Sequence, residues 1–339
     1  MDCLKQENEL KNFKTEMNHI VKYNIPDSTW SAFTDAKTYE EYQKNYVIKG
    51  KFHKHVPEDI VNDYEIVEHI MAQSYFYYPM YSEALRKLLT TYEMALKLKY
   101  KQIKGYDWKG EKITLEDDKI RKGNNLDTLI RWLHQNGHLE RNLDFYLHMK
   151  EIRNINMHPR QYSFMGASAS SIIRPLVNIF SEIFVPSEIV QDRQTKLNHY
   201  KEEFISLGAG PFVLNYNSSR FLIFQVEPLS YLNEKLFTVF WPIFDRIPES
   251  SESSEMPDPI LLSLSDLSCS KHEIQAKDFF SGQEINITTT NHPENLRRTK
   301  DHLFFITSKE ASNYRALCGY AINRFKEEQL YENYWLEEI

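Results

Sequence analysis

An arginine and a histidine near the middle of the chain are the residues best suited to chemistry. The segment from Arg153 to His158 reads RNINMH, so a permanent cation and a titratable imidazole stand five positions apart. Histidine can accept or donate a proton near neutral pH, and arginine offers a planar fork of donors to phosphate oxygens. Together they could cleave RNA without a metal ion. A base would activate the ribose 2′-hydroxyl, which attacks the adjacent phosphorus and leaves a 2′,3′-cyclic phosphate and a 5′-hydroxyl.

A helix is expected to carry this segment. The apolar residues that recur there at three- to four-residue spacing are Leu143, Tyr146, Met149, Ile152 and Ile155. Pro159 disfavours the helical conformation at the residue before it, so the helix is expected to end near Met157. Arg153 is expected to lie beside the apolar stripe, where packing does not require an arginine. If the last turn unwinds, the His158 ring can turn back toward the guanidinium.

Arg153, Asn154 and His158 match in order and spacing the signature of the HEPN superfamily, and the chain resembles these small α-helical ribonucleases. In that family an arginine, a polar residue, a short spacer and a histidine stand at the end of the third helix of a bundle. The resemblance covers about residues 63–185 and implies a metal-independent endoribonuclease with no cofactor. It implies that His158 is the general base or acid, that Arg153 stabilises the transition-state charge, and that Asn154 orients the histidine or the phosphate.

The resemblance also implies a homodimer in which two such helices meet across a two-fold axis. Cleavage by 2′-hydroxyl attack needs one proton removed and another supplied. His148 lies ten residues before His158, about 15 Å along a helix, so a second chain is expected to provide the second histidine. The implied biological role is antiphage defence or toxin–antitoxin control, with an antitoxin or another defence protein as a partner.

The charge around the motif is locally positive. Lys150, Arg160 and Arg174 lie near it in the expected bundle and are candidate RNA contacts. The whole chain of 339 residues has a net charge of −7, which argues against coating of nucleic acid but allows a local basic site.

The loose arginine–histidine pattern occurs at three other places in the chain. These pairs are Arg141/His148, Arg193/His199 and Arg297/His302. The first lies in mid-helix, the second follows the expected bundle, and the third falls in a segment with no helical period. Only the pair at Arg153 combines a helix end with the expected neighbours.

Periodicity predicts a bundle of four helices followed by one connecting helix. The bundle helices are expected near 81–99, 124–135, 139–157 and 170–184, and the connecting helix at 189–207. After Gly208 the pattern changes to short aromatic and β-branched runs, which are typical of strands. These runs are 212–214, 221–226, 236–241, 260–264, 284–290 and 302–307. A last helix is expected from Thr307, where Glu310 completes a capping-box pattern, to about Glu338.

These patterns predict an α+β chain, with a mostly α N-terminal part that holds the four-helix HEPN-like bundle, a β-rich C-terminal region and a final helix. The expected boundaries are 1–60 for an N-terminal helical extension with short helices near 4–21 and 39–46, 61–207 for the bundle, and 208–339 for the β-rich region with its terminal helix. An acidic, serine-rich loop is expected at 248–259.

Composition limits which cell compartment and which cofactors are expected for the chain. Three scattered cysteines, a polar N-terminus and the lack of a long apolar run favour a cytoplasmic protein with no membrane segment. There is no glycine-rich phosphate loop and no zinc spacing, so no metal site is expected. His53 and His55 are expected at the surface rather than as metal ligands, and Asp117 and Asp118 are expected in a solvated loop.

Two other classes of function remain open from the sequence. In one, the chain is a non-catalytic module that binds a nucleotide or a protein, and Arg153 only grips a phosphate. In the other, it is a structural subunit of a defence complex. The aromatic run Tyr75–Tyr78 could stack bases, although burial between helices is the favoured interpretation.

Overall fold

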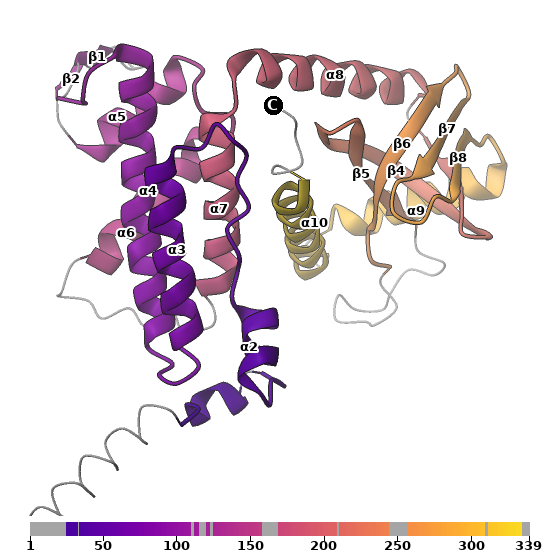
Figure 1. Cartoon of the computed structure of the whole chain (residues 1–339). Coiled ribbons are helices and arrows are strands. Elements are labelled where there is room, and N and C mark those ends of the chain that lie inside the picture. The colour runs from indigo at the N-terminus through magenta and orange to yellow at the C-terminus, as the bar shows by residue number, and fades with distance from the viewer. Residues whose placement is uncertain are drawn as a thin grey trace, which may run out of the picture. The chain divides into compact units, whose positions relative to one another are not determined.

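The computed structural model describes residues 25–32, 34–109, 112–114, 120–122, 125–157, 169–208, 210–243, 257–308 and 311–333 (Figure 1). The chain forms two compact units, Met1–Val185 and Pro186–Ile339. The described part of the first is mainly helical and that of the second contains a β-barrel, so the α+β prediction is confirmed.

The first unit is built around one long helix. Its elements are η1 (Ser28–Ala32), α2 (Tyr39–Tyr46), α3 (Glu58–Gln73), α4 (Met80–Lys104), β1 (Lys112–Thr114), β2 (Ile120–Lys122), α5 (Leu126–Gln135), α6 (Leu143–Met157) and α7 (Ser170–Phe184). Helix α4 contacts α3, α5, α6 and α7 (Figure 1). It ends at Gly105, whose φ of 77° is the left-handed conformation that glycine adopts most easily.

Helix α3 is an addition to the four helices that periodicity predicts. Ile60, Tyr64, Val67 and Met71 are buried at three- to four-residue spacing, so α3 presents a continuous apolar face, and it packs on α4. The four expected helices are present, and α7 spans the predicted residues.

The residues before α3 pack onto the helices rather than forming a separate extension. The Trp30 ring lies 4.8 Å from Tyr42 and 4.7 Å from Tyr78 between ring centroids, and the Tyr42 hydroxyl hydrogen-bonds to Ser74 Oγ at 2.6 Å. These aromatic contacts join the described residues from 28 onward to α3 and α4. The helix expected near 4–21 lies outside the described residues, as do Asp117 and Asp118.

Two predictions about exposure are corrected. His53 is buried, and its Nε2 lies 2.8 Å from the carbonyl oxygen of Ser181, so packing against α7 removes it from the surface. In the run Tyr75–Tyr78, both end residues are buried as expected, whereas Tyr77 is 60% exposed.

Within its described residues, the second unit is a six-stranded barrel with three helices. Its elements are α8 (Ser187–Ser206), β3 (Phe212–Tyr216), β4 (Ser219–Leu232), β5 (Lys235–Pro242), β6 (Ile260–Cys269), β7 (Glu273–Asp278), β8 (Glu284–Thr289), α9 (Pro293–Ile306) and α10 (Ser312–Asn333). The strands pair antiparallel in chain order, and β3 pairs with β8 to close the barrel, with Leu214 opposite Ile287.

Two tight turns set the first strand pairings. The residues between β3 and β4 are Asn217 and Ser218, and those between β4 and β5 are Asn233 and Glu234. All four have a φ between 50° and 59°, as the two-residue turns that suit the twist of a hairpin require.

Helix α8 belongs with the barrel, which moves the predicted boundary at residue 207. Leu197, Phe204 and Leu207 are part of the hydrophobic core that the barrel strands enclose. The compact units therefore divide between Val185 and Pro186, because the apolar face of α8 is buried by the barrel.

The C-terminal segment differs from the prediction in two places. The expected strand at 302–307 lies within α9 and its C-cap, and the final helix α10 begins at Ser312 rather than Thr307. Thr307 instead ends α9, where its Oγ1 donates to the carbonyl of Leu303 at 2.9 Å. None of the helices in the described ranges is both long and apolar enough to cross a bilayer.

Candidate functional site

The candidate site lies in the last turns of α6. Its buried side chains Tyr146, Met149 and Asn156 and the half-buried Arg153 recur at three- to four-residue spacing. Arg153 therefore lies within the inward stripe of α6 rather than beside it, whereas Ile155 is 46% exposed. The sequence pattern misplaced the stripe because α6 packs on α4 and α5 through polar side chains as well as apolar ones.

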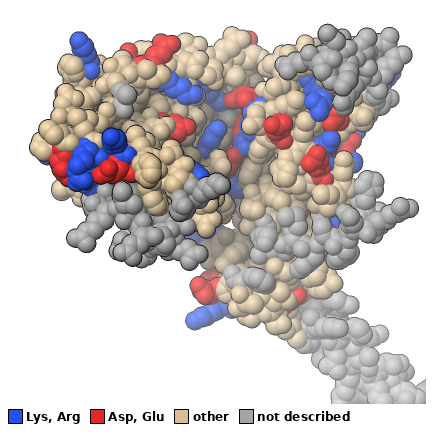
Figure 2. All heavy atoms as spheres, turned by 180° about the vertical axis from the view of Figure 1, so that it is seen from behind, with Lys and Arg blue, Asp and Glu red and all other residues tan. Residues whose placement is uncertain are grey.

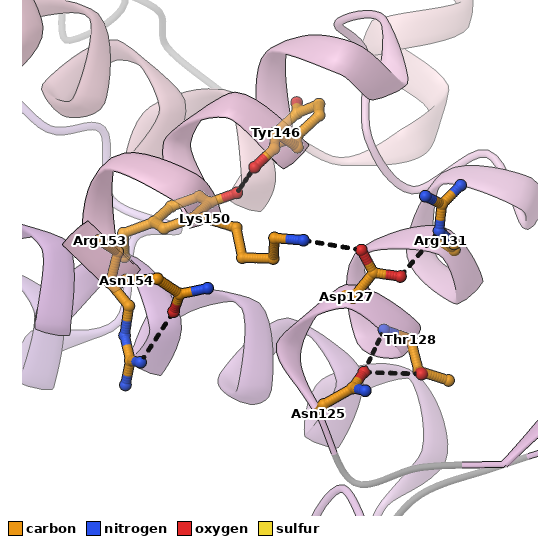
Figure 3. Close-up of polar contacts among 9 residues, drawn as sticks. Asn125, Asp127, Thr128, Arg131, Tyr146, Lys150, Arg153 and Asn154 are labelled. Atoms are coloured by element: carbon orange, nitrogen blue, oxygen red, sulfur yellow. Dashed lines mark hydrogen bonds and ion pairs between the residues drawn. The ribbon is translucent and has the colours of Figure 1, made fainter. Parts of the chain in front are cut away.

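Arg153 is held by two neighbours. Its Nη2 contacts Oε2 of Glu93 on α4 at 2.5 Å, and its Nη1 donates to Oδ1 of Asn154 at 3.2 Å. Figure 3 shows the Arg153 and Asn154 side chains turned toward one another. Nε of Arg153 is buried and has no hydrogen-bond partner among the described residues. The guanidinium is thus fixed in position while part of its donor capacity stays unused.

Glu93 is shared between two cations. Its Oε1 accepts from Nζ of Lys97, one turn further along α4, at 2.6 Å. Burial raises the pKa of Glu93, but the hydrogen bonds and charges of Lys97 and Arg153 outweigh it, so the pKa lies below its ordinary value. Glu93 is therefore a carboxylate at neutral pH, and an incoming phosphate would compete with it for Arg153.

A second ion-pair cluster lies one turn back on α6. Nζ of Lys150 contacts Oδ1 of Asp127 on α5 at 2.8 Å, and Oδ2 of the same carboxylate accepts from Nε of Arg131 at 2.8 Å. Burial raises the pKa of Asp127, but the hydrogen bonds and charges of Lys150 and Arg131 lower it by a larger amount. The pKa of Asp127 therefore lies below its ordinary value. Lys150, a candidate RNA contact on α6, extends toward Asp127 (Figure 3) and is engaged in joining two helices.

Local hydrogen bonds fix the helices that carry these side chains. Oδ1 of Asn125 accepts from the backbone N–H and the hydroxyl of Thr128, both at 2.8 Å, and so caps the start of α5 two residues before Asp127. The Tyr92 hydroxyl of α4 donates to the backbone carbonyl of Tyr146 on α6 at 3.2 Å. Burial raises the pKa of Tyr146, so its phenol stays neutral.

Of the remaining predicted site residues, the structure describes Arg174 of α7. Arg141, just before α6, pairs with Glu182 near the end of α7, with an Nε–Oε2 distance of 2.7 Å, so the two helices run antiparallel (Figure 1). The start of α7, with Arg174, therefore lies at the same end of the unit as the last turn of α6. The positive charge of Arg174 also acts on Tyr81 of α4. His158 and Arg160 lie outside the described residues.

Residues of two of the three look-alike pairs make other contacts. Arg141 is committed to Glu182, and the side chains of this pair are only 13% and 3% exposed. Arg297 and His302 stand on α9, which corrects the prediction that this segment lacks a helical period. Arg297 pairs with Glu294 and Asp301 on its own helix, and His302 is buried against Phe224 with ring centroids 4.6 Å apart.

Charges of both signs are interspersed on the described surface of the face shown in Figure 2. Among the residues that the structure places, no cluster of three or more His, Cys, Asp or Glu side chains could hold a metal ion. No protein-family model, curated protein or solved structure matches the chain.

Sequence reasoning missed the two carboxylates that hold the cations of α6. Glu93 precedes Lys97 by four residues, so that pair on one helix face is visible in the sequence. Its second partner, Arg153, lies sixty residues away on another helix, as the sequence separation of the hydrogen bond shows. Asp127 and Lys150 are likewise 23 residues apart. Residue spacing in a single sequence does not reveal such ion pairs between different helices.

Proposed function

We propose that this chain is a metal-independent endoribonuclease of HEPN type. The observation that supports this proposal is the fixed Arg153 guanidinium in the last turns of α6. Glu93 and Asn154 each accept one hydrogen bond from a different terminal nitrogen, and each of these nitrogens carries a second N–H that can donate to a ligand. A preorganised donor of this kind stabilises negative charge that develops in a transition state, because it does not have to reorganise during the reaction.

In the proposed reaction, His158 removes the proton of the ribose 2′-hydroxyl, and the 2′-oxygen attacks phosphorus. The bond from phosphorus to the 5′-oxygen breaks, and this oxygen takes a proton from a second histidine, His158 of a second copy of the chain. Arg153 binds the non-bridging oxygens, which carry the developing charge. Asn154 keeps the guanidinium in its orientation through the 3.2 Å hydrogen bond, which is the positioning role that we assign to it.

The proposed setting is antiphage defence or toxin–antitoxin control in the cytoplasm, with a second copy of the chain and a regulatory protein as partners. This part of the proposal rests on the resemblance of the motif to HEPN ribonucleases. Arg174 and Arg160 are the proposed further RNA contacts. Lys150 can take this role only if RNA displaces Asp127 from its 2.8 Å contact.

One observation favours a different function. The ion pair between Arg153 and Glu93 joins α6 to α4, and this is a sufficient structural reason for an arginine at that position. In that case the unit is a non-catalytic binding module or a structural subunit, and Arg153 only stabilises the helix packing.

RNA cleavage by the full chain in the presence of EDTA separates these functions. We expect cleavage to continue without metal, and to give 5′-hydroxyl ends that polynucleotide kinase can label directly. His158→Ala should reduce cleavage by about two to four orders of magnitude, because proton transfer by a positioned side chain contributes that much. His148→Ala, at an exposed position of α6, is the control and should keep most activity. Cleavage that EDTA abolishes and magnesium restores would overturn the mechanism, and no cleavage at all would favour the binding module.

A further inference from the structure

The outer face of the barrel carries a cavity of about 1090 Å³ beside the start of α9. All of its described lining residues belong to the second unit. The ring of His302 packs on Phe224 of β4 with centroids 4.6 Å apart, which joins α9 to the barrel. The volume lies just above the range of about 300–1,000 Å³ that is usual for small-molecule sites.

The floor of the cavity is apolar. Val213 of β3 and Leu222 of β4 are cross-strand partners, and their neighbours Leu214 and Ile223 belong to the barrel core. Because side chains alternate along a strand, Val213 and Leu222 face outward into the cavity. The backbone N–H of Ile243 donates to the carbonyl of Leu222 at 2.8 Å and extends this floor beyond β5.

The walls of the cavity are cationic. Arg220 lies two residues before Leu222 on the same outward face of β4, is exposed, and forms no ion pair within the described part of the chain. On the opposite wall, His292, Asn295 and Arg298 follow one another at three-residue spacing, so they lie on one face at the start of α9. Two arginines from two different elements therefore line one cavity.

No carboxylate is among the described residues that line the cavity. Glu294 of α9 is not among the lining residues and contacts Arg297 at 2.6 Å, although its charge also acts on Arg298 and His292. On the same side, Nδ2 of Asn295 donates to Oγ1 of Thr290 at 3.0 Å, which holds the amide against the end of β8. The cavity thus combines two arginines and hydrogen-bonding groups with an apolar floor.

We propose that this cavity binds a nucleotide, that is, a small molecule that joins a phosphate group to a flat apolar ring. Arg220 and Arg298 bind the phosphate through charge-assisted hydrogen bonds. The ring packs on the floor of Val213, Leu222 and Ile243. The second unit is then a ligand-binding unit, and this binding does not depend on RNA cleavage by the first unit.

Calorimetric titration of the full chain tests the ligand class. The probes are the four nucleoside 5′-monophosphates, the corresponding nucleosides and inorganic phosphate. We expect saturable binding of at least one monophosphate. Its nucleoside and inorganic phosphate should each bind at least about tenfold more weakly, because each lacks half of the contacts. Absence of saturable binding for all four monophosphates would overturn the proposal. Inorganic phosphate that binds as tightly as the nucleotides would overturn the nucleotide class.

Neighbouring arginines on α9 provide a matched pair of variants. Arg298→Gln should weaken binding about tenfold or more, whereas Arg297→Gln makes the same change in net charge one residue away, outside the lining, and should keep the affinity within about twofold. Arg220→Gln, at an exposed position, should weaken binding as much as Arg298→Gln does. This variant decides the question if Arg298→Gln fails to fold. Equal weakening by the α9 variants, or no effect of Arg220→Gln, would mean that no specific site exists there.

Discussion

Arg153 of α6 contacts Glu93 of α4 through nitrogen and oxygen atoms 2.5 Å apart. The cation that the sequence singles out for phosphate chemistry is therefore already bound to a carboxylate of a neighbouring helix. Side-chain exposures of 29% and 20% place the pair at the edge of the bundle, where solvent weakens the attraction. An RNA phosphate can compete with Glu93 at such a place, and this competition makes the pair a means of testing the proposed function.

Replacement of Arg153 separates catalysis from packing, because Arg131 is a close structural match. Both arginines bind a carboxylate of the helical unit, at 2.5 Å and 2.8 Å, and their side chains are 29% and 23% exposed. We expect Arg153→Ala to lower kcat/KM for RNA cleavage by about 100- to 1,000-fold, and Arg131→Ala to lower it only a few-fold. Thermal unfolding should show a similar small loss of about 1 kcal/mol or less for both. Equal loss of activity in the two variants would assign Arg153 a purely structural role.

Replacement of Glu93 tests the competition directly. Glu93→Gln removes the negative charge that opposes phosphate binding, so KM for RNA should fall by about three- to tenfold without a rise in kcat. Glu83→Gln is the control, since Glu83 is on the same helix and pairs with Arg86 of that helix instead. Steady-state kinetics on both variants gives the answer. A KM that stays the same or rises in Glu93→Gln would contradict phosphate binding by Arg153.

The barrel unit should lose stability in mild acid because of His302. Burial lowers the pKa of His302 to about 4, whereas an unfolded histidine titrates near its ordinary value of about 6.5. Between these values the unfolded chain binds the proton and the folded chain does not, so stability is full above about pH 6.5 and falls as the pH drops toward about 4. The loss from this group is of the order of 3 kcal/mol.

Urea denaturation at a series of pH values measures this dependence. His302→Gln should flatten the fall in the free energy of unfolding across that window, and His199→Gln, which replaces an exposed histidine of α8, should leave it unchanged. An unchanged slope in His302→Gln would mean that His302 is accessible to protons in the folded protein.

The proposed reaction needs two copies of the chain. Each chain offers one His158, and cleavage requires one group that accepts a proton and another that donates one. An excess of His158→Ala chains mixed with parent chains, under conditions of subunit exchange, should therefore reduce activity well below simple dilution. Activity proportional to the fraction of parent chains, or a fully active monomer by light scattering, would contradict a site built from two copies.

The sequence predicted best the elements whose apolar period is long and regular. Helix α7 begins and ends where its pattern does, because its apolar face is continuous from Ile173 to Ile183. Helix α9 was missed because the run Leu303–Ile306 is short, and a short apolar run is compatible with a strand or a helix. Pro293 in its first turn is a start signal that could have indicated the helix.

The barrel and the candidate site show what a single sequence cannot provide. Strand β7 was missed because Ile274, Ala276 and Asp278 are its buried residues, and only the first is strongly apolar. Closure of the barrel depends on pairing of β3 with β8, which are far apart in the chain. At the site, the motif residues were identified from their types, but their carboxylate partners became visible only when the helices were packed together.

Closure of the barrel restricts how the second unit can recruit other proteins. Each of its six strands is hydrogen-bonded on both sides, since β3 and β8 pair with each other as well as with β4 and β7. Within the described residues of this sheet no strand offers an unpaired edge, so a partner cannot bind by adding a strand of its own, and edge-to-edge aggregation is suppressed. Recognition by this unit must therefore operate through side chains on the outer face, the helices or the loops, where single substitutions can change it without disturbing the sheet.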